Sequence, residues 1–429
     1  MNTSIHFFTG LIVILPLVIT AACGGAPSKE EAAPRNVTVA QSGETDVIGT
    51  DNQALQKAAD MLRPGDTLSI GPGTYLMENS LFILVSDVVV RGTEGKTILA
   101  KGPGVKSLLV DDAGYGIFDL AVAEPEKFKV GMGLSVLDNA HRDGWAVSVT
   151  TVTAIEGEIL RIDPMTLQDY NIEAQEAWVQ NAFPILAGME VSGVTFEDII
   201  VDGNREENFY MNGCRGGAIY LYKAKDCLIK NCVARNFNGD GISFQITERV
   251  RVIDCEAYGQ TGLGIHPGTG SPYAEVSNCH IHDNDSDGLF LCWRVKHGKF
   301  SGNLIENNSR YGISVGHKDT DNLLTGNTVR GNRGHGVYFR RETFKNSGHR
   351  CVFRGNTVVD NGNADEGCGF YIEPPTEGIV IENNKIAETR KGAERTQRYG
   401  VYRARGAGSV SLSNNEMQGH AKGDFYDEN

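Results

Sequence analysis

Short runs of alternating apolar and polar residues fill much of the chain, and in its second half each run begins with a glycine. The glycines recur at intervals of 23 or 24 residues, and later at 33 and 31: Gly241, Gly264, Gly288, Gly312, Gly336, Gly369 and Gly400. The first and third residues after the glycine are mostly apolar, as in GVYF at 336–339, so they should point inward and the second outward. A repeat of this length predicts stacked units that bury one face against their neighbours.

A second column of residues lies upstream of these strands and combines cysteine with asparagine. Its members are 23 or 24 residues apart: Cys232, Cys255, Cys279, Asn303 and Asn327. Residues in register on successive coils should form a packed ladder rather than a disulfide framework, so we expect mostly buried, unreactive thiols. Short strands, glycine and asparagine turns and the lack of helical periodicity in the repeats together predict an all-β parallel β-helix.

With these repeats the chain resembles the right-handed parallel β-helix (pectate-lyase-like) superfamily over roughly residues 37–410. The resemblance implies relatives that most often process pectin, alginate or glycosaminoglycans. The segment 51–62 fits an N-terminal capping helix, which would cover the open end of the stack. Asp51 is its candidate N-cap, and the apolar face of this helix consists of Leu55, Ala58, Ala59 and Leu62.

The 24-residue rhythm is interrupted once, by a segment of alternating strands that predicts a small inserted β-subdomain. The predicted organisation is a lipoprotein-type signal peptide at 1–22, a tether at 23–36, the N-terminal cap and first coils at 37–122, the β-insertion at 123–185, the β-helix core at 186–410 and a C-terminal tail at 411–429.

The N-terminus carries the one strongly apolar stretch of the chain, residues 7–22, followed directly by Cys23. It resembles a bacterial lipoprotein signal with lipidation at Cys23, which implies an exported, membrane-anchored protein. Thr20 replaces the usual leucine, and residues 1–10 contain no lysine or arginine. A signal peptide cut nearby with Cys23 unmodified and a single membrane anchor therefore stay open as alternatives.

The amino-acid composition limits the kinds of molecule that the chain is expected to bind. Glycine accounts for 52 of 429 residues, above the usual share of about 7%. The net charge of −14 argues against nucleic-acid binding and by itself fits a basic ligand or a divalent cation better, unless a local basic site overrides it. The polysaccharide partner is what the resemblance implies, and we further expect membrane contact only through the lipid anchor and a monomeric chain.

Basic and aromatic residues nevertheless gather along one strip. Residues at matching positions of adjacent coils lie about 4.8 Å apart. The outward position, two after each glycine, carries Ser243, His266, Phe290, Ser314, Tyr338, Tyr371 and Tyr402. Aromatic rings stack on sugars and cations bind carboxylates or sulfates, so the predicted substrate-binding residues are Phe290, Trp293, Arg294, Lys296, His297, Tyr338, Arg341, Tyr371 and Glu373.

Lys318 and Arg340 are 22 residues apart and are expected to be neighbours on adjacent coils. They resemble the Lys/Arg pair of the alginate lyase and chondroitinase B family, which implies Lys318 as the base and Arg340 as the acid of a β-elimination. The chemistry requires the uronate carboxylate to be neutralised. The acidic calcium-binding motif of that family is not evident, and a surface ion pair of Lys318 with Asp319 or Asp321 is the simpler interpretation.

A hydrolase would instead need two carboxylic acids. Asp240 and Asp287 occupy one column two coils apart, about 9.6 Å by backbone spacing, near the upper limit for inverting glycosidases. Their surroundings faintly resemble polygalacturonase motifs, although Leu263 and His266 stand where that family's paired aspartates belong. Both aspartates precede a glycine, a turn context that favours Asp for conformational reasons alone.

His266 and His317 complete the candidate catalytic set, as base, substrate donor or metal ligand. At a separation of about 9.6 Å they should not share a metal. No cofactor is assigned, although Asp283, Asp285 and Asp287 alternate like a calcium loop without the glycine and glutamate of an EF-hand.

The sequence therefore favours cleavage of an acidic extracellular polysaccharide by β-elimination. Glycoside hydrolysis, uronate epimerisation, and a non-catalytic glycan-binding or scaffold role remain alternatives.

Overall fold

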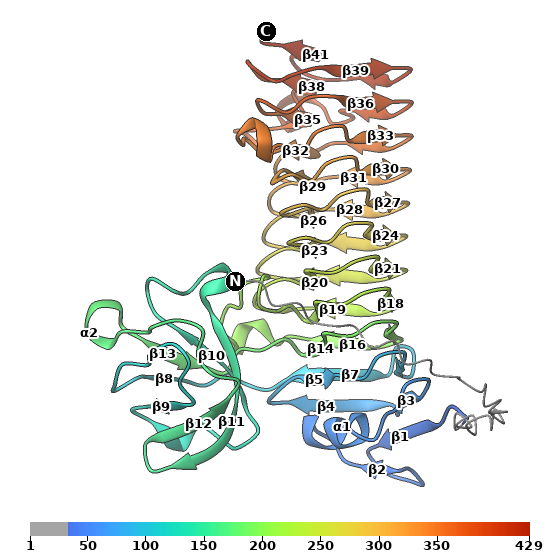
Figure 1. The fold of residues 1–429 in the computed structure, drawn as a ribbon. Helices are drawn as coiled ribbons and strands as arrows, with labels where there is room; N and C mark the ends of the chain where they lie inside the picture. The colour runs from blue at the N-terminus through green and yellow to red at the C-terminus, as the bar shows by residue number, and fades with distance from the viewer. Residues whose placement is uncertain (1–32) are drawn as a thin grey trace, which may run out of the picture. The chain divides into compact units, whose positions relative to one another are not determined.

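The computed structural model describes residues 33–429, and three long parallel sheets dominate it (Figure 1). Each coil adds one short strand to each sheet, so a strand pairs with the equivalent strand one coil away. Residues 34–429 form one compact unit. The predicted all-β solenoid is confirmed.

Sheet A has 13 strands, in the spatial order β2 (Val47–Ile48), β1 (Asn36–Ala40), β3 (Thr67–Ile70), β6 (Val89–Arg91), β15 (Thr195–Glu197), β18 (Leu228–Lys230), β21 (Arg251–Ile253), β24 (Glu275–Ser277), β27 (Lys299–Ser301), β30 (Leu323–Thr325), β33 (Val352–Arg354), β36 (Ile379–Glu382) and β39 (Val410–Ser413). Sheet B has 11: β4 (Gly73–Met77), β7 (Thr97–Lys101), β16 (Ile200–Asp202), β19 (Val233–Arg235), β22 (Glu256–Tyr258), β25 (His280–His282), β28 (Leu304–Glu306), β31 (Thr328–Arg330), β34 (Thr357–Val359), β37 (Lys385–Ala387) and β40 (Glu416–Gln418). Sheet C also has 11, running from β41 (Gly423–Asp427) through β38 (Tyr399–Arg403), β35 (Cys368–Ile372), β32 (Val337–Phe339), β29 (Ile313–Val315), β26 (Leu289–Phe290), β23 (Ile265–Pro267), β20 (Ile242–Gln245), β17 (Ile219–Tyr222) and β14 (Leu186–Met189) to β5 (Leu81–Ile83).

The core lies between the three sheets and is built from the inward residue of each short strand. In sheet A, Val276 pairs with Phe300 and Phe300 with Leu324, and all three are fully buried. Burying such a side chain stabilises the fold by about 1.5–3 kcal/mol relative to exposure. The alternation seen in the sequence therefore reports directly on which side of each strand faces the core.

The corner between sheets A and B contains the predicted ladder of cysteines and asparagines. Asn327 accepts a hydrogen bond from the backbone N–H of Asn303 at 3.0 Å and donates one to the Phe300 carbonyl at 2.9 Å. Asn356, one coil on, accepts in the same way from Asn327. Burial raises the pKa of the Cys232 thiol to about 12. Within residues 33–429 every cysteine is free, and all but Cys214 are buried.

The insertion is a six-stranded antiparallel sheet with its own apolar core. Its spatial order is β8 (Lys106–Leu108), β13 (Trp178–Gln180), β10 (Gly133–Leu137), β11 (Ser148–Glu156), β12 (Ile159–Asp163) and β9 (Asp119–Ala121). Strands β8 and β9 precede residue 123, the expected start. It lies beside the first coils (Figure 1), where Asn79 donates to Thr151 at 3.0 Å and Ser135 to the Ala182 carbonyl at 2.7 Å.

The helices are few and short. Helix α1 (Asn52–Ala59) begins after Asp51, whose side chain accepts from the Ala54 N–H, and buries Leu55, Ala58 and Ala59 as expected. It contacts β1 to β5, and its role as an end cap stays a prediction. The other helical segments are α2 (Ile172–Gln175), η1 (Pro125–Lys127), η2 (Gly144–Ala146), η3 (Arg205–Glu207), η4 (Phe344–Asn346) and η5 (Gly392–Glu394).

The predicted C-terminal tail forms regular strands in the structure. The segment expected to be a tail contains most of β39 and all of β40 and β41, which pair with the preceding coil in all three sheets. The signal peptide and Cys23 lie outside the described residues. Among the helices of residues 33–429, none has the length and apolar character needed to cross a membrane.

Candidate functional site

The outward column predicted from the glycine spacing lies on the outer face of sheet C, although Ser243, His266 and Ser314 are buried there. Strand pairing aligns Ser243 with His266, Phe290 with Ser314, and Ser314 with Tyr338. It then aligns Tyr338 with Tyr371 and Tyr371 with Tyr402. The strip is therefore continuous over these coils, with small and charged residues at one end and tyrosines at the other.

Two turns that follow strands of sheet C have an unusual backbone. Trp293 and Arg294 have φ of 60° and 72°, and His317 and Lys318, one coil on, have φ of 49° and 67°. Non-glycine residues in this left-handed region cost free energy, and such residues cluster at functional sites. The turns are in register, because the Arg294 N–H donates to the His317 carbonyl at 2.9 Å. The Trp293 and His317 rings stack with centroids 4.7 Å apart.

Arg340 lies at the centre of the charged end. Its guanidinium donates to Ser314 Oγ at 2.7 Å and to the Leu291 carbonyl at 2.6 Å, and contacts Asp319 at 3.4 Å. It also lies over the Phe290 ring, 4.2 Å from the centroid. The arginine side chain is only 13% exposed, so these contacts hold its charge in a fixed position.

The burial of Asp319 shifts the pKa of its carboxyl group. Burial raises the pKa of the Asp319 carboxyl to about 7, although Arg340 and the backbone N–H groups of Val295 and Gly316 oppose the shift. The Arg340–Asp319 contact is thus a buried ion pair beneath the two left-handed turns.

His317 connects this pair to a carboxylate at the surface. Its Nε2 lies 2.7 Å from Glu342 Oε1, and its Nδ1 lies 3.3 Å from Cys292 Sγ and 3.5 Å from Arg340 Nη2. Burial, and next the Arg340 charge, lower the pKa of His317 to about 4. The imidazole is therefore neutral at neutral pH, while burial raises the pKa of Glu342.

The structure does not bring Lys318 to Arg340. The residue one coil before Arg340 is Gly316, where a Cβ would come within 2.8 Å of Arg340 Nε. The Lys318 N–H donates to the Asn346 carbonyl, but no hydrogen bond or ion pair of its ammonium is found within residues 33–429. The simpler alternative has no support either, because Asp319 pairs with Arg340 and Asp321 with Arg350.

His266 and Asp240 form a buried pair on the coils that precede Phe290 in the strip. His266 Nδ1 lies 2.7 Å from Asp240 Oδ2, and His266 Nε2 is buried without a hydrogen-bond partner. Gly213 covers the pair so closely that a Cβ there would lie 1.7 Å from Asp240 Oδ2. Both side chains are closed off from solvent.

The two aspartates proposed for hydrolysis serve the turns. Asp240 accepts from the Leu263 N–H at 3.0 Å and Asp287 from the Tyr311 N–H at 3.1 Å, each one coil on. Both are almost fully buried, and burial raises the pKa of Asp287. Their contacts fit the conformational role, which the position before a glycine had already suggested.

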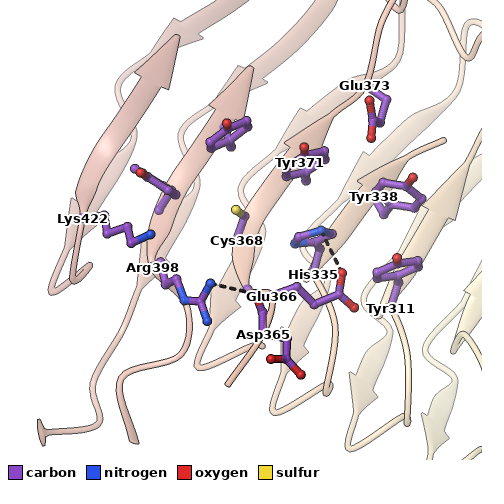
Figure 2. Close-up of a pocket in the computed structure, with 13 residues that line it drawn as sticks. Tyr311, His335, Tyr338, Asp365, Glu366, Cys368, Tyr371, Glu373, Arg398 and Lys422 are labelled. Carbon is purple, nitrogen blue, oxygen red and sulfur yellow. Dashed lines mark hydrogen bonds and ion pairs between the residues drawn. The ribbon is translucent and has the colours of Figure 1, made fainter. Parts of the chain in front are cut away.

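The tyrosine end of the strip encloses a cavity of about 390 Å³. Tyr371 stacks on Tyr402 with centroids 4.8 Å apart and on His335 at 4.5 Å. Figure 2 shows Glu366 and Glu373 on opposite sides of these rings, with Arg398 and Lys422 at the rim. Burial raises the pKa of both glutamates and lowers that of His335, whose Nε2 faces Glu366 at 3.5 Å, to about 3. We call this the tyrosine cavity.

The remaining residues that the sequence predicted for binding lie in different parts of the structure. Arg341 contacts Glu373 at 3.6 Å. His297 stacks on Tyr273 beside a separate hollow that includes Lys299, away from the strip, and no side-chain partner of Lys296 is found among residues 33–429. The alternating aspartates do not converge, because Asp283 bonds His282, Asp285 bonds Arg205 and Asp287 bonds Tyr311.

Several site residues were missed by sequence reasoning. Tyr311, His335 and Tyr399 each stand directly before a strand-opening glycine, in the column that had been noticed only for Asp240 and Asp287. Extending that column would have found them. Cys292 and Glu342 gave no such signal, because the residue type at their repeat positions changes from coil to coil.

Comparison with known proteins addresses the fold. The family model "Right handed beta helix region" matches residues 188–347, and "Periplasmic copper-binding protein (NosD)" matches residues 292–428. The match over residues 188–347 and the three long parallel sheets show that the chain has the fold of the right-handed parallel β-helix superfamily. The predicted recognition of this superfamily is thereby confirmed.

Solved β-helix structures resemble the chain at low identity. The A-module of the mannuronan C-5 epimerase AlgE6 from Azotobacter vinelandii is 15% identical with a TM-score of 0.53, over 90% of this chain and 94% of that one. The Dettilon tailspike protein (gp208) is 12% identical with a TM-score of 0.50, over 86% of this chain and 57% of that one. No curated protein matches the sequence. For this β-helix protein these likenesses establish the fold alone.

Proposed function

We propose that this β-helix protein cleaves an acidic polysaccharide that lies along the outer face of sheet C. The observation that carries the proposal is the pair of stacked left-handed turns, Trp293–Arg294 and His317–Lys318, next to the tyrosine cavity. Strained turns that present an indole and two cations on adjacent coils suit a charged sugar, and stacked tyrosines suit the sugars that follow it. One of the structural neighbours, the AlgE6 module, is named as an epimerase of mannuronan.

The mechanism we favour is β-elimination. Lys318 takes the proton next to the uronate carboxylate, the bond to the leaving oxygen breaks, and a carbon–carbon double bond forms. Arg294, in register beside Lys318, neutralises the substrate carboxylate and makes the carbanion tolerable.

The role of Arg340 changes from the acid expected from the resemblance. Both of its Nη groups are engaged, by Ser314, Leu291 and Asp319, and its Nε is buried without a partner, so we assign it to hold positive charge beneath the site. Tyr338 is the proposed proton donor to the leaving oxygen, because burial, and next the Glu373 charge, raise its pKa and keep the phenol protonated.

The test is a panel of uronate-containing and sulfated polysaccharides, followed by absorbance near 235 nm and by a reducing-end assay. We expect both signals to rise together, and Lys318→Ala to lower the rate by about 10²–10⁴-fold, the range of a lost general base. Lys385→Ala, on the exposed face of sheet B, is the matched control and should keep the rate. If His317→Asn abolishes the activity and Lys318→Ala does not, the base is His317.

Glycoside hydrolysis is the second candidate, and a specific observation favours it. Glu366 and Glu373 flank the tyrosine cavity, and both have raised pKa values, as a general acid requires. New reducing ends without absorbance at 235 nm would exclude elimination and move the catalytic residues to this pair. Silence in both assays, with glycan binding retained, would leave a binding role.

Export and lipid anchoring at Cys23 belong to the same proposal. A periplasmic family model matches residues 292–428, which is consistent with export. Metabolic labelling with a fatty-acid analogue should label the wild-type protein and not Cys23→Ser.

A further inference from the structure

A cluster of histidines and carboxylates lies on sheet B, on a different sheet from the proposed catalytic strip. Strand pairing aligns Glu256 with His280 and Tyr258 with His282 on the neighbouring coil. It aligns His282 in turn with Glu306. Because alternate residues of a strand face the same side, strands β22, β25 and β28 present these side chains together on the outer surface of the solenoid.

The two imidazoles point one nitrogen each at the same oxygen. Glu256 Oε1 lies 3.1 Å from His282 Nε2 and 3.8 Å from His280 Nδ1. The two rings stack with centroids 3.9 Å apart. The three donor atoms, one from each residue, all lie within 4.8 Å of one another.

The other nitrogen of each imidazole is bonded to a different carboxylate. His282 Nδ1 lies 2.6 Å from Asp283 Oδ2, and His280 Nε2 lies 2.9 Å from Glu306 Oε1. Histidines that bind metals almost always donate their second N–H to a carboxylate, carbonyl or water, which fixes the tautomer and leaves the lone pair for the metal. Here both histidines are arranged in that way, with their remaining nitrogens turned toward Glu256.

We propose that Glu256, His280 and His282 bind a divalent transition-metal ion, with Asp283 and Glu306 as the carboxylates that orient the two histidines. Imidazole nitrogens select ions such as Zn²⁺ and Cu²⁺ over Ca²⁺ and Mg²⁺, which prefer oxygen. Ligand atoms of a tetrahedral zinc site lie roughly 3.3 Å apart, so small side-chain rotations bring the three donors into range. The three side chains are half-buried, so solvent can reach the site.

Charge in the cluster also favours a cation. Glu256, Asp283 and Glu306 carry three negative charges, and Arg330, bonded to Glu306 at 2.6 Å, returns one positive charge. The carboxylates and the guanidinium together therefore leave two negative charges. The three proposed ligands precede the segment that matches the copper-binding family model, which begins at residue 292 and includes Glu306.

The experiment is a calorimetric titration of the full chain, prepared without a histidine tag and stripped with a chelator, with Zn²⁺ and separately with Ca²⁺. We expect one Zn²⁺ per chain at this site and no binding of Ca²⁺ there. Glu256→Gln and His282→Gln should each weaken the binding of Zn²⁺ by tenfold or more, and Asp283→Asn should weaken it less because it acts through His282.

His297→Gln is the matched control, because His297 stacks on Tyr273 at 5.5 Å much as His282 stacks on Tyr258 at 5.0 Å. It should leave the affinity unchanged. Circular dichroism verifies that each variant is folded. Absence of stoichiometric Zn²⁺ binding, or equal loss in His297→Gln and His282→Gln, would overturn the proposal.

Discussion

The corner between sheets A and B and the turns after sheet C both recur on successive coils of the solenoid. They differ in whether the same residue is repeated from coil to coil. The corner repeats asparagine on coil after coil, and each amide forms the same hydrogen bonds to the coils beside it, as Asn303 and Asn327 do. The turns change residue at every coil, from Gly268 to Cys292, Gly316 and Arg340. Both places have buried polar groups and left-handed backbone. The corner uses one glycine, asparagine or aspartate per coil for it, as at Asn278 and Gly302, whereas the turns place two successive larger residues there, as at Trp293 and Arg294.

The difference separates two uses of a repeat. A ladder of identical side chains satisfies buried backbone groups and stabilises the stack. Turns that vary while they keep a costly left-handed backbone, as at Trp293 and Lys318, do not gain stability from that choice. The comparison predicts that substitutions in the corner change stability alone, whereas those in the turns change activity as well.

The largest expected effect is at Arg340. Arg340→Met removes the only ion-pair partner that the described residues give to Asp319, and breaking a buried pair from one side costs about 3–5 kcal/mol. Urea denaturation should show this loss, together with loss of activity. The double variant Arg340→Met, Asp319→Asn should recover part of the stability and none of the activity. A loss below 1 kcal/mol in the single variant would contradict the buried pair.

A smaller effect is expected in the ladder. Asn327→Ala leaves the Asn303 N–H and the Phe300 carbonyl without their side-chain partner, which costs about 1–3 kcal/mol for unsatisfied buried groups. The rate of polysaccharide cleavage per folded molecule should not change. Thr328→Ala, the half-buried outward neighbour, is the control. A change in rate with Asn327→Ala would contradict the prediction that corner residues affect stability alone.

The sequence predicted the fold far better than the site, for a physical reason. Each glycine and each asparagine of the repeat makes the same contacts as its equivalents, so spacing alone aligns Phe290, Ser314 and Tyr338. The contacts of Arg340 depend on how its long side chain folds back over Ser314 and Asp319, which spacing does not encode. Its in-register neighbour is Gly316, 24 residues earlier, and the expected pairing with Lys318 departs from that register. The depth of Asp240 beneath Gly213 likewise depends on a loop that the repeat does not encode.

Titration of His317 sharpens the comparison further. Its pKa in the folded state is about 4, below the value of about 6.5 for an exposed histidine. The unfolded chain therefore takes up a proton first as pH falls, and stability decreases between about pH 6.5 and pH 4. His317→Gln should remove that part of the acid sensitivity, measured as urea midpoints across this range. An unchanged pH profile would mean that the imidazole is not held neutral.

The smallest effect is expected at the exposed ion pairs that line the solenoid. Arg354 contacts Glu382 one coil on at 2.6 Å, and the arginine side chain is 55% exposed. Water and salt screen such a pair, so Arg354→Ala should cost less than about 1 kcal/mol. Removing the arginine of the buried pair would then cost several kcal/mol more stability than removing the arginine of an exposed pair. The exposed pair has the shorter contact, 2.6 Å against 3.4 Å, so we expect burial rather than contact distance to decide which arginine the fold depends on. A cost for Arg354→Ala equal to that for Arg340→Met would refute this explanation.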